Sequence, residues 1–481
     1  MGPNGGLWKN LPAFNAYMTR VQSVLQSGAP SAEYLIYFPM HDIWHDGSEG
    51  LPLFTMHNQE KWLQPTSFYR TAMGLRKAGI SYDFLSDRLL SEVTVQDHEF
   101  KIGGRPLSFI VVPETRYMPE ASLRRLLDLA AQGGCVVFLG ALPKEVPGFG
   151  NFKARQKSAA DMIEEAQRLH AKGRDLRSLE SVSFGKGMLW IARDVEGYFK
   201  SVNFTLGESL VYRKLSFIRR KQPDGWSYFI VNNSGKAFDE KIMPSKQLKS
   251  AVLFDPWTGR SGVAEVELHT DNPSVPNQKN FHGSIRLVLA PGESRIIRTY
   301  TDRDAEGPRW SDPEPTGAPI ALTGTWKVSF LDGGPSLPPS FETSSLGSWT
   351  EQKNEAYRNF SGTALYRLEF DLKEKSPALL DLGEIANTAK VRLNGMNVGT
   401  CWSPPHRLDV GDLLVEGKNV LEVEVTNLAA NRIADLDRRK VPWKAFHEIN
   451  FVNIDYKNFD ASGWLPLPSG LLGPVTLVRT K

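Results

Sequence analysis

The spacing of apolar residues changes once along this 481-residue chain, and that change limits the folds open to it. From residue 32 to about residue 141, continuous apolar runs such as "EYLIYFP" and "CVVFLG" alternate with helical segments such as "MPEASLRRLLDLAAQGG". Unalternating strands separated by helices are typical of a parallel sheet covered on both faces. From about residue 184 onward, short strands follow one another between Gly, Pro and Asn turns. The sequence therefore predicts an α/β unit followed by all-β units.

Together with the helix at its start and a Pro-rich stretch near residue 310, this change divides the chain into five predicted segments. The first holds "FNAYMTRVQSVLQSG", which places Phe14, Tyr17 and Val21 at helical spacing and predicts one amphipathic helix. The strand-and-helix segment fits a flavodoxin-like (amidotransferase-like) α/β domain. The later segments fit a small antiparallel β-sandwich and a longer jelly-roll β-sandwich. The predicted limits are 1–29 for the helix, 30–180 for the α/β domain, 181–301 for the antiparallel sandwich, 302–319 for a polar, Pro-rich linker and 320–481 for the jelly roll.

The balance of charges argues against two classes of partner. Lysine and arginine number 57 against 54 aspartates and glutamates, so the net charge of +3 predicts no nucleic acid and no membrane. No apolar run approaches the ~18 residues of a membrane span, and "MGPNGGLWKNLPAF" lacks the basic and apolar regions of a signal peptide. The two cysteines, Cys135 and Cys401, suggest no disulfide framework or zinc site.

Cys135 raises the question of amidotransferase chemistry, because it lies in an α/β segment of the matching type. A catalytic cysteine would stand on a sharp strand-to-helix turn beside a histidine. Cys135 instead opens the strand "CVVFLG", so we expect its side chain to pack in the core. The chain also lacks a G-x-S-x-G elbow, a P-loop and a G-x-G-x-x-G fingerprint. The α/β domain is predicted to be a scaffold, and a reactive Cys135 would instead indicate an active amidotransferase.

The long segment after the first strand, "PMHDIWHDGSEGLPLFTMHNQEKW", is rich in polar and aromatic residues. It leaves the carboxyl end of a strand, where ligands gather in open α/β sheets. Asp42, His45 and Asp46 are candidates for a metal site. Asp42, Trp44 and His45 are candidates for carbohydrate binding or a domain interface, with Trp44 as a platform for a sugar ring. The alternative is that the segment packs against a neighbouring domain.

The stretch "AKVRLNGMNVGTCWSPPHRLDV" predicts two strands joined by a turn at Asn394-Gly395 and followed by a Pro-rich corner. Two interpretations of the corner stay open. In the first it is architectural, with Trp402 buried and Arg407 paired with Asp409 or capping nearby carbonyls. In the second, Trp402 and His406 line a glycan-facing surface, and the indole stacks on sugar C–H groups.

Several phrases, taken in order, resemble one enzyme family. "LWKNLPAFNAYMTRVQSVLQSG", "AEYLIYFPMHDIW", "WSYFIVNNS", "DPWTG" and "LAPGES" are followed by "YRNFSGTALYRLEFDL", "VRLNGMNVGTCWSPPHRLDV" and "LPSGLLGPVTLVR". Over nearly its whole length the chain resembles the C-terminal half of the α-L-rhamnosidases of glycoside hydrolase family 106. The last three phrases resemble the sugar-binding jelly roll of glycoside hydrolase family 2.

The resemblance implies a role in carbohydrate degradation, with catalysis in another part of the enzyme. In the family, the catalytic carboxylates belong to a barrel that precedes the matching region, and residues 1–29 look like its exit helix. No position of this sequence matches those carboxylates, so we expect an accessory portion of a glycosidase that is inactive alone. The alternative is a stand-alone, non-catalytic carbohydrate-binding or structural module.

The resemblance also bears on partners, cofactors and compartment. It implies a rhamnose-containing glycan and an N-terminal catalytic barrel as partners. It makes no cofactor certain, leaves calcium open for the complete enzyme, and implies a periplasmic or secreted protein. In the family pattern the loop "NLAANRIADLDRR", with Asn431, Arg432 and Asp435, faces the catalytic domain. Side chains of this kind can hold a sugar hydroxyl or a domain interface equally well.

Overall fold

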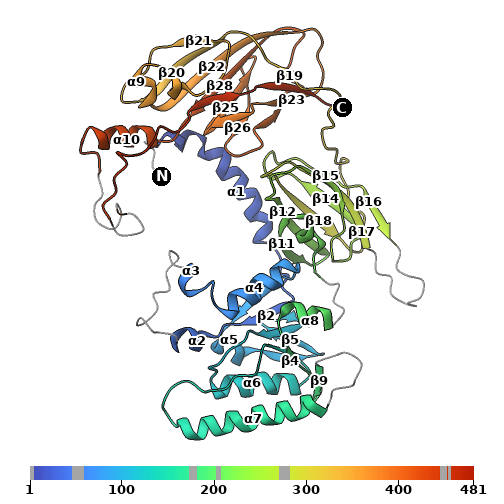
Figure 1. The fold of residues 1–481 in the computed structure, drawn as a ribbon. Coiled ribbons are helices and arrows are strands. Elements are labelled where there is room, and N and C mark those ends of the chain that lie inside the picture. The colour runs from blue at the N-terminus through green and yellow to red at the C-terminus, as the bar shows by residue number, and fades with distance from the viewer. Residues whose placement is uncertain are drawn as a thin grey trace.

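A computed structural model of the protein describes residues 5–45, 59–172, 181–201, 207–269, 282–444, 452 and 457–481. Figure 1 shows an α/β unit at the bottom, a middle β unit at the right and a C-terminal β unit at the top. The turn η1 (Gly6–Asn10) and helix α1 (Leu11–Leu25) run from the C-terminal unit down the side of the middle unit. The fold is mixed, with many antiparallel sheets and fewer helices.

The α/β unit is built on a six-stranded sheet in the order β3-β2-β7-β8-β10-β9. Its first strand along the chain lies inside the sheet, and later strands are added on both sides. Five strands are parallel, and β9 pairs antiparallel at one edge. The strands are β2 (Tyr34–Tyr37), β3 (Tyr82–Leu85), β7 (Phe109–Val112), β8 (Cys135–Leu139), β9 (Ser181–Phe184) and β10 (Gly187–Ala192).

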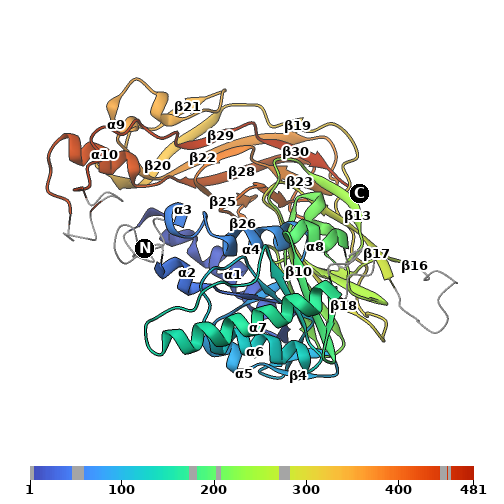
Figure 2. The same cartoon turned by 60° about the horizontal axis from the view of Figure 1, so that its bottom comes forward.

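Helices cover both faces of this sheet, because successive residues of its strands point to opposite faces and are buried on each. In β2, Leu35 and Tyr37 face the core that packs under α6 and α7, whereas Tyr34 and Ile36 face α4 and α8. Figure 2 brings α6 and α7 to the front. The helices are α2 (Met40–His45), α3 (Gln59–Trp62), α4 (Ser67–Lys77), α5 (Asp87–Glu92), α6 (Glu120–Ala131), α7 (Phe152–Lys172) and α8 (Val195–Ser201). A small antiparallel sheet adds β4 (Thr94–Gln96), β5 (Glu99–Ile102) and β6 (Arg105–Leu107).

The predicted boundary between residues 180 and 181 is wrong. Strand β10 pairs in parallel with β8, and β9 pairs with β10, so both strands complete the α/β sheet. Helix α8 then packs back on α4. The α/β unit therefore extends to Ser201, the last residue of α8, because this helix packs on the face of the sheet that β10 completes.

The middle unit packs a six-stranded sheet against a three-stranded one around an apolar core that includes Tyr228 and Leu287. The larger sheet comprises β1 (Ala29–Pro30), β11 (Leu215–Gln222), β12 (Gly225–Asn232), β18 (Ser294–Tyr300), β14 (Ser250–Phe254) and β15 (Ser261–Val263). The smaller comprises β13 (Phe238–Ile242), β17 (His282–Leu289) and β16 (Val266–His269), and the turn η3 (Ser209–Arg213) precedes β11.

The segment predicted as the linker 302–319 is partly packed on this middle unit. The backbone N–H of Trp310 donates to the carbonyl of Val263 at 2.9 Å, and the Trp310 ring packs on the core. The predicted linker is therefore too long, because the polar, Pro-rich composition of the segment gave no sign that Trp310 packs, partly buried, on the core.

The C-terminal unit is again two packed sheets, with Trp326, Trp349 and Tyr366 in the core between them. The larger sheet comprises β21 (Phe341–Thr343), β20 (Trp326–Gly334), β22 (Ser361–Leu372), β28 (Gly417–Thr426), β25 (Thr388–Leu393) and β26 (Met396–Cys401). The smaller comprises β19 (Ile320–Ala321), β30 (Thr476–Arg479), β23 (Ala378–Asp381) and β27 (Arg407–Asp409), beside the pair β24 (Glu384–Ala386) and β29 (Gly470–Gly473). The remaining elements are η4 (Trp349–Glu351), α9 (Glu355–Arg358) and α10 (Ala430–Arg438).

The turn at Asn394-Gly395 is confirmed. Both residues have positive φ, at 51° and 78°, and they join β25 to β26 in an antiparallel pair. Asn and Gly tolerate this left-handed conformation, which a two-residue hairpin requires.

Candidate functional site

Helix α2 packs two predicted site residues, Asp42 and His45, against the loop that follows β7. The Asp42 carboxylate accepts the backbone N–H of Arg116 at 3.0 Å and that of Tyr117 at 2.7 Å. The Tyr117 hydroxyl lies 2.7 Å from His45 Nε2. Arg116 also donates to Glu145 at 2.6 Å. These contacts join the carboxyl end of β2 to that of β7 and favour a packing role for this segment.

The proposed metal ligands are only partly described. Asp46 lies outside the described residues. Within the described ranges, no three His, Cys, Asp or Glu side chains gather in a way that could hold an ion. A metal at Asp42 and His45 would have to displace the partners they already bind. Trp44 is 51% exposed and meets the ring of His41 edge-on at 5.5 Å, so its role as a sugar platform stays a prediction.

Asp87 forms a second polar cluster at the same sheet edge, which the sequence reasoning missed. Its carboxylate accepts hydrogen bonds from the hydroxyls of Tyr37 at 2.6 Å and Ser122 at 2.5 Å, and His41 Nε2 lies 3.3 Å away. Burial raises the pKa of Asp87, but the hydrogen bonds from His41, Ser122 and Tyr37 outweigh it and hold the pKa below its usual value. The sequence could have indicated this cluster through the positions of its residues, because Tyr37 ends β2 and Asp87 follows the neighbouring strand β3.

Trp402 lies where three parts of the chain meet. Its ring stacks on Trp257 of the middle unit, with centroids 4.5 Å apart and planes 11° apart. Phe14 and Tyr17 of α1 meet the Trp402 ring edge-on at 5.1 and 5.2 Å. The contacts favour the architectural interpretation of this corner. They also correct it, because Trp402 packs between units rather than in the core of the C-terminal unit.

His406 and Arg407 bind within the C-terminal unit. Arg407 Nε donates to Asp381 Oδ2 at 2.7 Å, and the two residues are paired across β23 and β27. The predicted pair of Arg407 with Asp409 is wrong, because Arg407 pairs with Asp381, the residue directly opposite on the neighbouring strand. His406 Nδ1 lies 2.8 Å from the carbonyl of Gly383. Neither contact depends on a glycan.

Asn431, Arg432 and Asp435 lie on helix α10, so the predicted loop is wrong. Asn431 and Asp435, one helical turn apart, are 3% and 4% exposed and form the inner face of the helix. Asn431 accepts from the Leu467 backbone N–H at 2.8 Å and donates to its carbonyl at 3.0 Å. Asp435 pairs with Arg432 at 2.7 Å and with Arg439 at 2.9 Å. These bonds fix α10 and the segment before β29.

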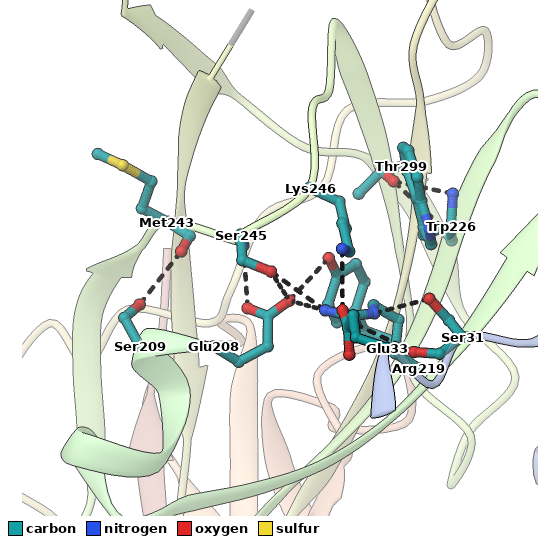
Figure 3. Close-up of polar contacts among 11 residues, drawn as sticks. Ser31, Glu33, Glu208, Ser209, Arg219, Trp226, Met243, Ser245, Lys246 and Thr299 are labelled. Carbon is teal, nitrogen blue, oxygen red and sulfur yellow. Dashed lines mark hydrogen bonds and ion pairs between the residues drawn. The ribbon is translucent and has the colours of Figure 1, made fainter. Parts of the chain in front are cut away.

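Arg219 of β11 joins the α/β unit to the middle unit (Figure 3). Its guanidinium donates to Ser31 Oγ at 3.0 Å and to the Ser31 carbonyl at 3.1 Å, on the α/β side. On the other side it donates to Glu208 at 2.6 Å and to Ser245 at 3.1 Å. A further bond reaches Glu33. These acceptors engage all five N–H groups of the guanidinium.

Arg219 and Glu208 are buried, and the positive and negative charges of their cluster balance. The side chains of Arg219 and Glu208 are 1% and 0% exposed, and Lys246 Nζ lies 2.9 Å from Glu33 Oε1. Two cations therefore face two carboxylates. Burial alone would lower the pKa of Arg219, but attraction to Glu33 and Glu208 raises it. Sequence reasoning missed this cluster, since its members come from segments far apart in the chain.

Comparison with known proteins assigns the chain to a family. Residues 8–267, more than half of the 481, match the family model of the α-L-rhamnosidases of glycoside hydrolase family 106. The chain belongs to family 106. A rhamnosidase from Novosphingobium sp. PP1Y shares the fold over 99% of this family 106 chain, with a TM-score of 0.69 and 22% sequence identity.

A curated relative matches a shorter part. The "Putative beta-glucuronidase" of Formosa agariphila is 37% identical over 181 residues, which is 33% of this family 106 chain. The match covers 15% of that relative, and the chain covers 41% of the Novosphingobium rhamnosidase. The chain thus spans well under two thirds of either relative.

The acidic groups at these sites are occupied by protein donors. A glycosidase needs two carboxylates flanking the scissile bond. In this family 106 chain, Asp42 accepts backbone N–H groups, Asp87 accepts hydroxyls, and Asp435 pairs with arginines. Cys135 is partly buried in β8, and burial raises the pKa of its thiol to about 12. Each of these side chains therefore has a structural use where it stands.

The described helices are all too short or too polar to cross a membrane.

Proposed function

We propose that this family 106 chain is the accessory C-terminal portion of an α-L-rhamnosidase, in which a catalytic barrel outside residues 1–481 cleaves a rhamnose-containing glycan. The observation that carries the proposal is the family match over residues 8–267. It includes α1, the whole α/β unit and most strands of the middle unit. The chain's 41% share of the Novosphingobium rhamnosidase fits a portion of a longer enzyme.

The anchoring of the N-terminal segment supports this role. Asn10 Nδ2 donates to Thr388 Oγ1 at 2.7 Å in the C-terminal unit. Arg20 Nη1 donates to the carbonyl of Trp257 at 2.8 Å in the middle unit. A helix held at both β units is suited to transmit the position of a preceding domain to them.

The same proposal includes a specific fold for the α/β unit and for the C-terminal unit. The α/β unit is taken as flavodoxin-like, which is supported by five parallel strands in the order second, first, third, fourth and fifth. The C-terminal unit is taken as a family 2-type jelly roll, supported by its two packed sheets. The proposal includes a periplasmic or secreted location, which is supported by the resemblance to family 106 alone.

The test is an activity assay on the purified chain with an aryl α-L-rhamnoside. We expect no turnover above the blank from residues 1–481, and turnover once the coding region immediately upstream of Met1 is included in frame. Turnover by the chain alone, abolished by Asp87→Asn or another acidic substitution, would contradict the accessory role. An upstream promoter in place of an in-frame barrel would instead favour a stand-alone carbohydrate-binding module.

A further inference from the structure

A cavity of about 390 Å³ opens at the seam between the α/β unit and the middle unit. Its walls come from residues 30–32, 80–83 and 215–220, with Arg76 and Val211. The cavity lies at the amino ends of β2 and β3, whereas the Asp87 cluster lies at their carboxyl ends. Small-molecule sites typically occupy about 300–1,000 Å³ and favour domain seams, so both size and place suit a small ligand.

One end of the cavity is formed by groups that are hydrogen-bonded within the protein. Ser31 and Arg219 line it, and both belong to the buried network of Figure 3. Because all five donors of Arg219 are engaged within the protein, this residue shapes the cavity without binding a ligand itself. Recognition therefore falls to the other polar side chains of the wall.

Three of those side chains carry N–H or O–H groups that have no acceptor among the described residues. Arg76, in the last turn of α4, is exposed and forms no ion pair or hydrogen bond among the described side chains. Arg220 donates through Nε to the Ser27 carbonyl and through Nη2 to the Gly28 carbonyl, which leaves Nη1 free of these bonds. The hydroxyl of half-buried Tyr82 likewise finds no acceptor in the described part of the chain.

The remaining walls set the character of the site. The carboxylate of Asp83 is neutralised by Arg105, whose Nη1 lies 2.7 Å away. The wall charge that is left is therefore positive. Tyr82 and Phe217 add aromatic surface, which can pack against the C–H groups of a sugar ring.

We propose that this cavity binds an acidic monosaccharide unit, with its carboxylate held by Arg76 and Arg220 and its ring against Tyr82. A guanidinium presents paired N–H groups that match the two oxygens of a carboxylate. The Tyr82 hydroxyl supplies a further donor for a ring hydroxyl. The saccharide part of the inference rests on the proposed carbohydrate function, whereas the carboxylate part rests on the arginines.

The test is calorimetric titration of the full chain with sodium D-glucuronate and sodium D-galacturonate. L-Rhamnose, sodium acetate and sodium sulfate serve as comparison ligands at equal ionic strength. We expect one uronate to bind with a Kd of about 1 mM, and the comparison ligands to bind at least about tenfold more weakly. Arg76→Ala should weaken uronate binding about tenfold, because it removes a charged donor of paired N–H groups. Tyr82→Phe should weaken it about threefold, because it removes one neutral hydroxyl donor.

Arg88→Ala is the matched control. Arg88 is 90% exposed on α5 and makes only a loose contact of 3.9 Å with Glu92, so its loss should leave binding unchanged. A melting curve for each variant separates lost binding from lost folding, and Arg76→Gln replaces Arg76→Ala if the latter is unstable.

Three results would overturn the inference: no binding of either uronate, unchanged binding by Arg76→Ala, or acetate and sulfate binding as tightly as the uronates. The last would indicate a simple anion site. Because binding is measured without turnover, this test stands apart from the rhamnosidase assay. Uronate binding without any activity in the extended protein would contradict the proposed function and leave the cavity's ligand as inferred.

Discussion

Trp402 and Trp257 stack with their ring centroids 4.5 Å apart, although they belong to different β units. Phe14 and Tyr17 close the same contact from α1, and the Tyr17 hydroxyl lies 2.9 Å from Ser294 Oγ. Four aromatic rings thus join the N-terminal helix, the middle unit and the C-terminal unit. Aromatic pairs stabilise by about 0.5–1.5 kcal/mol beyond their buried area, so the cluster is well suited to fix how the units meet.

Trp402→Ala should lower the free energy of unfolding of the full chain by about 2–4 kcal/mol, because a half-buried indole loses its packing against three rings. Trp44→Ala is the control: Trp44 is 51% exposed, and its loss should cost no more than about 0.5 kcal/mol. Denaturant unfolding measures both. A Trp402→Ala chain that keeps its stability and loses glycan binding would support the glycan-facing interpretation instead.

The same contact can be measured as a pair. In a double-mutant cycle, Trp257→Ala and Trp402→Ala should show a coupling energy of about 0.5–1.5 kcal/mol, since each removes the partner of the other. Additive effects of the two substitutions would mean that the stacking contributes nothing beyond burial.

Arg219→Met should destabilise the chain by about 3–5 kcal/mol, because it leaves Glu208 buried without its cation. Arg213→Met is the matched control, since Arg213 pairs with Glu240 at the surface and such pairs contribute about 0–1 kcal/mol. Urea unfolding of both variants gives the comparison. Equal losses would show that the Arg219 network does not hold the seam between the units.

The regular elements were predictable where local patterns decide them. The continuous apolar runs that became β2 and β8 are buried on both faces of their sheet. The segment "EGKNVLEVEVTN", in which apolar and polar residues alternate from Leu421 to Val425, contains β28, where Leu421, Val423 and Val425 are buried. Helix α10 escaped prediction because its inner face carries Asn431 and Asp435, polar residues whose partners lie elsewhere in the chain.

The sites were less predictable because their contacts are not local. Nothing in the sequence around Arg219 indicates Ser31 or Glu33 as partners, nor do the residues near Trp402 indicate Trp257. Polar residues at strand ends could be identified as a set. Which of them meet depends on the sheet order, and that is how Asp87 rather than Asp42 came to face Tyr37.

Asp87→Asn tests the pH dependence of the sheet edge. The folded pKa of Asp87 is lowered, so its ionised form stabilises the protein above the unfolded value near pH 4, and this contribution is lost as the pH falls through the folded pKa. At pH 7 the variant should be less stable than the parent by about 1–3 kcal/mol, because the carboxylate accepts charge-assisted hydrogen bonds from Tyr37 and Ser122.

The difference between the two proteins should shrink as the pH falls from about 5, and it should be lost once the pH is below the lowered folded pKa of Asp87. Unfolding by urea at a series of pH values measures it. A difference that stays constant over this range would show that the charge of Asp87 is not what the hydroxyls stabilise.

Thiol labelling tests whether the two cysteines are structural or reactive. Burial raises the pKa of both thiols to about 12, and at Cys401 the charge of Asp381 adds to the effect. The thiolate is the reactive form, so at pH 8 both native cysteines should react about a thousandfold more slowly than a free cysteine of pKa ~8.5. Denatured protein should release two rapidly reacting thiols, which controls for oxidation. Fast labelling of native Cys135 alone, lost in Cys135→Ser, would instead support a catalytic cysteine and reopen the amidotransferase interpretation.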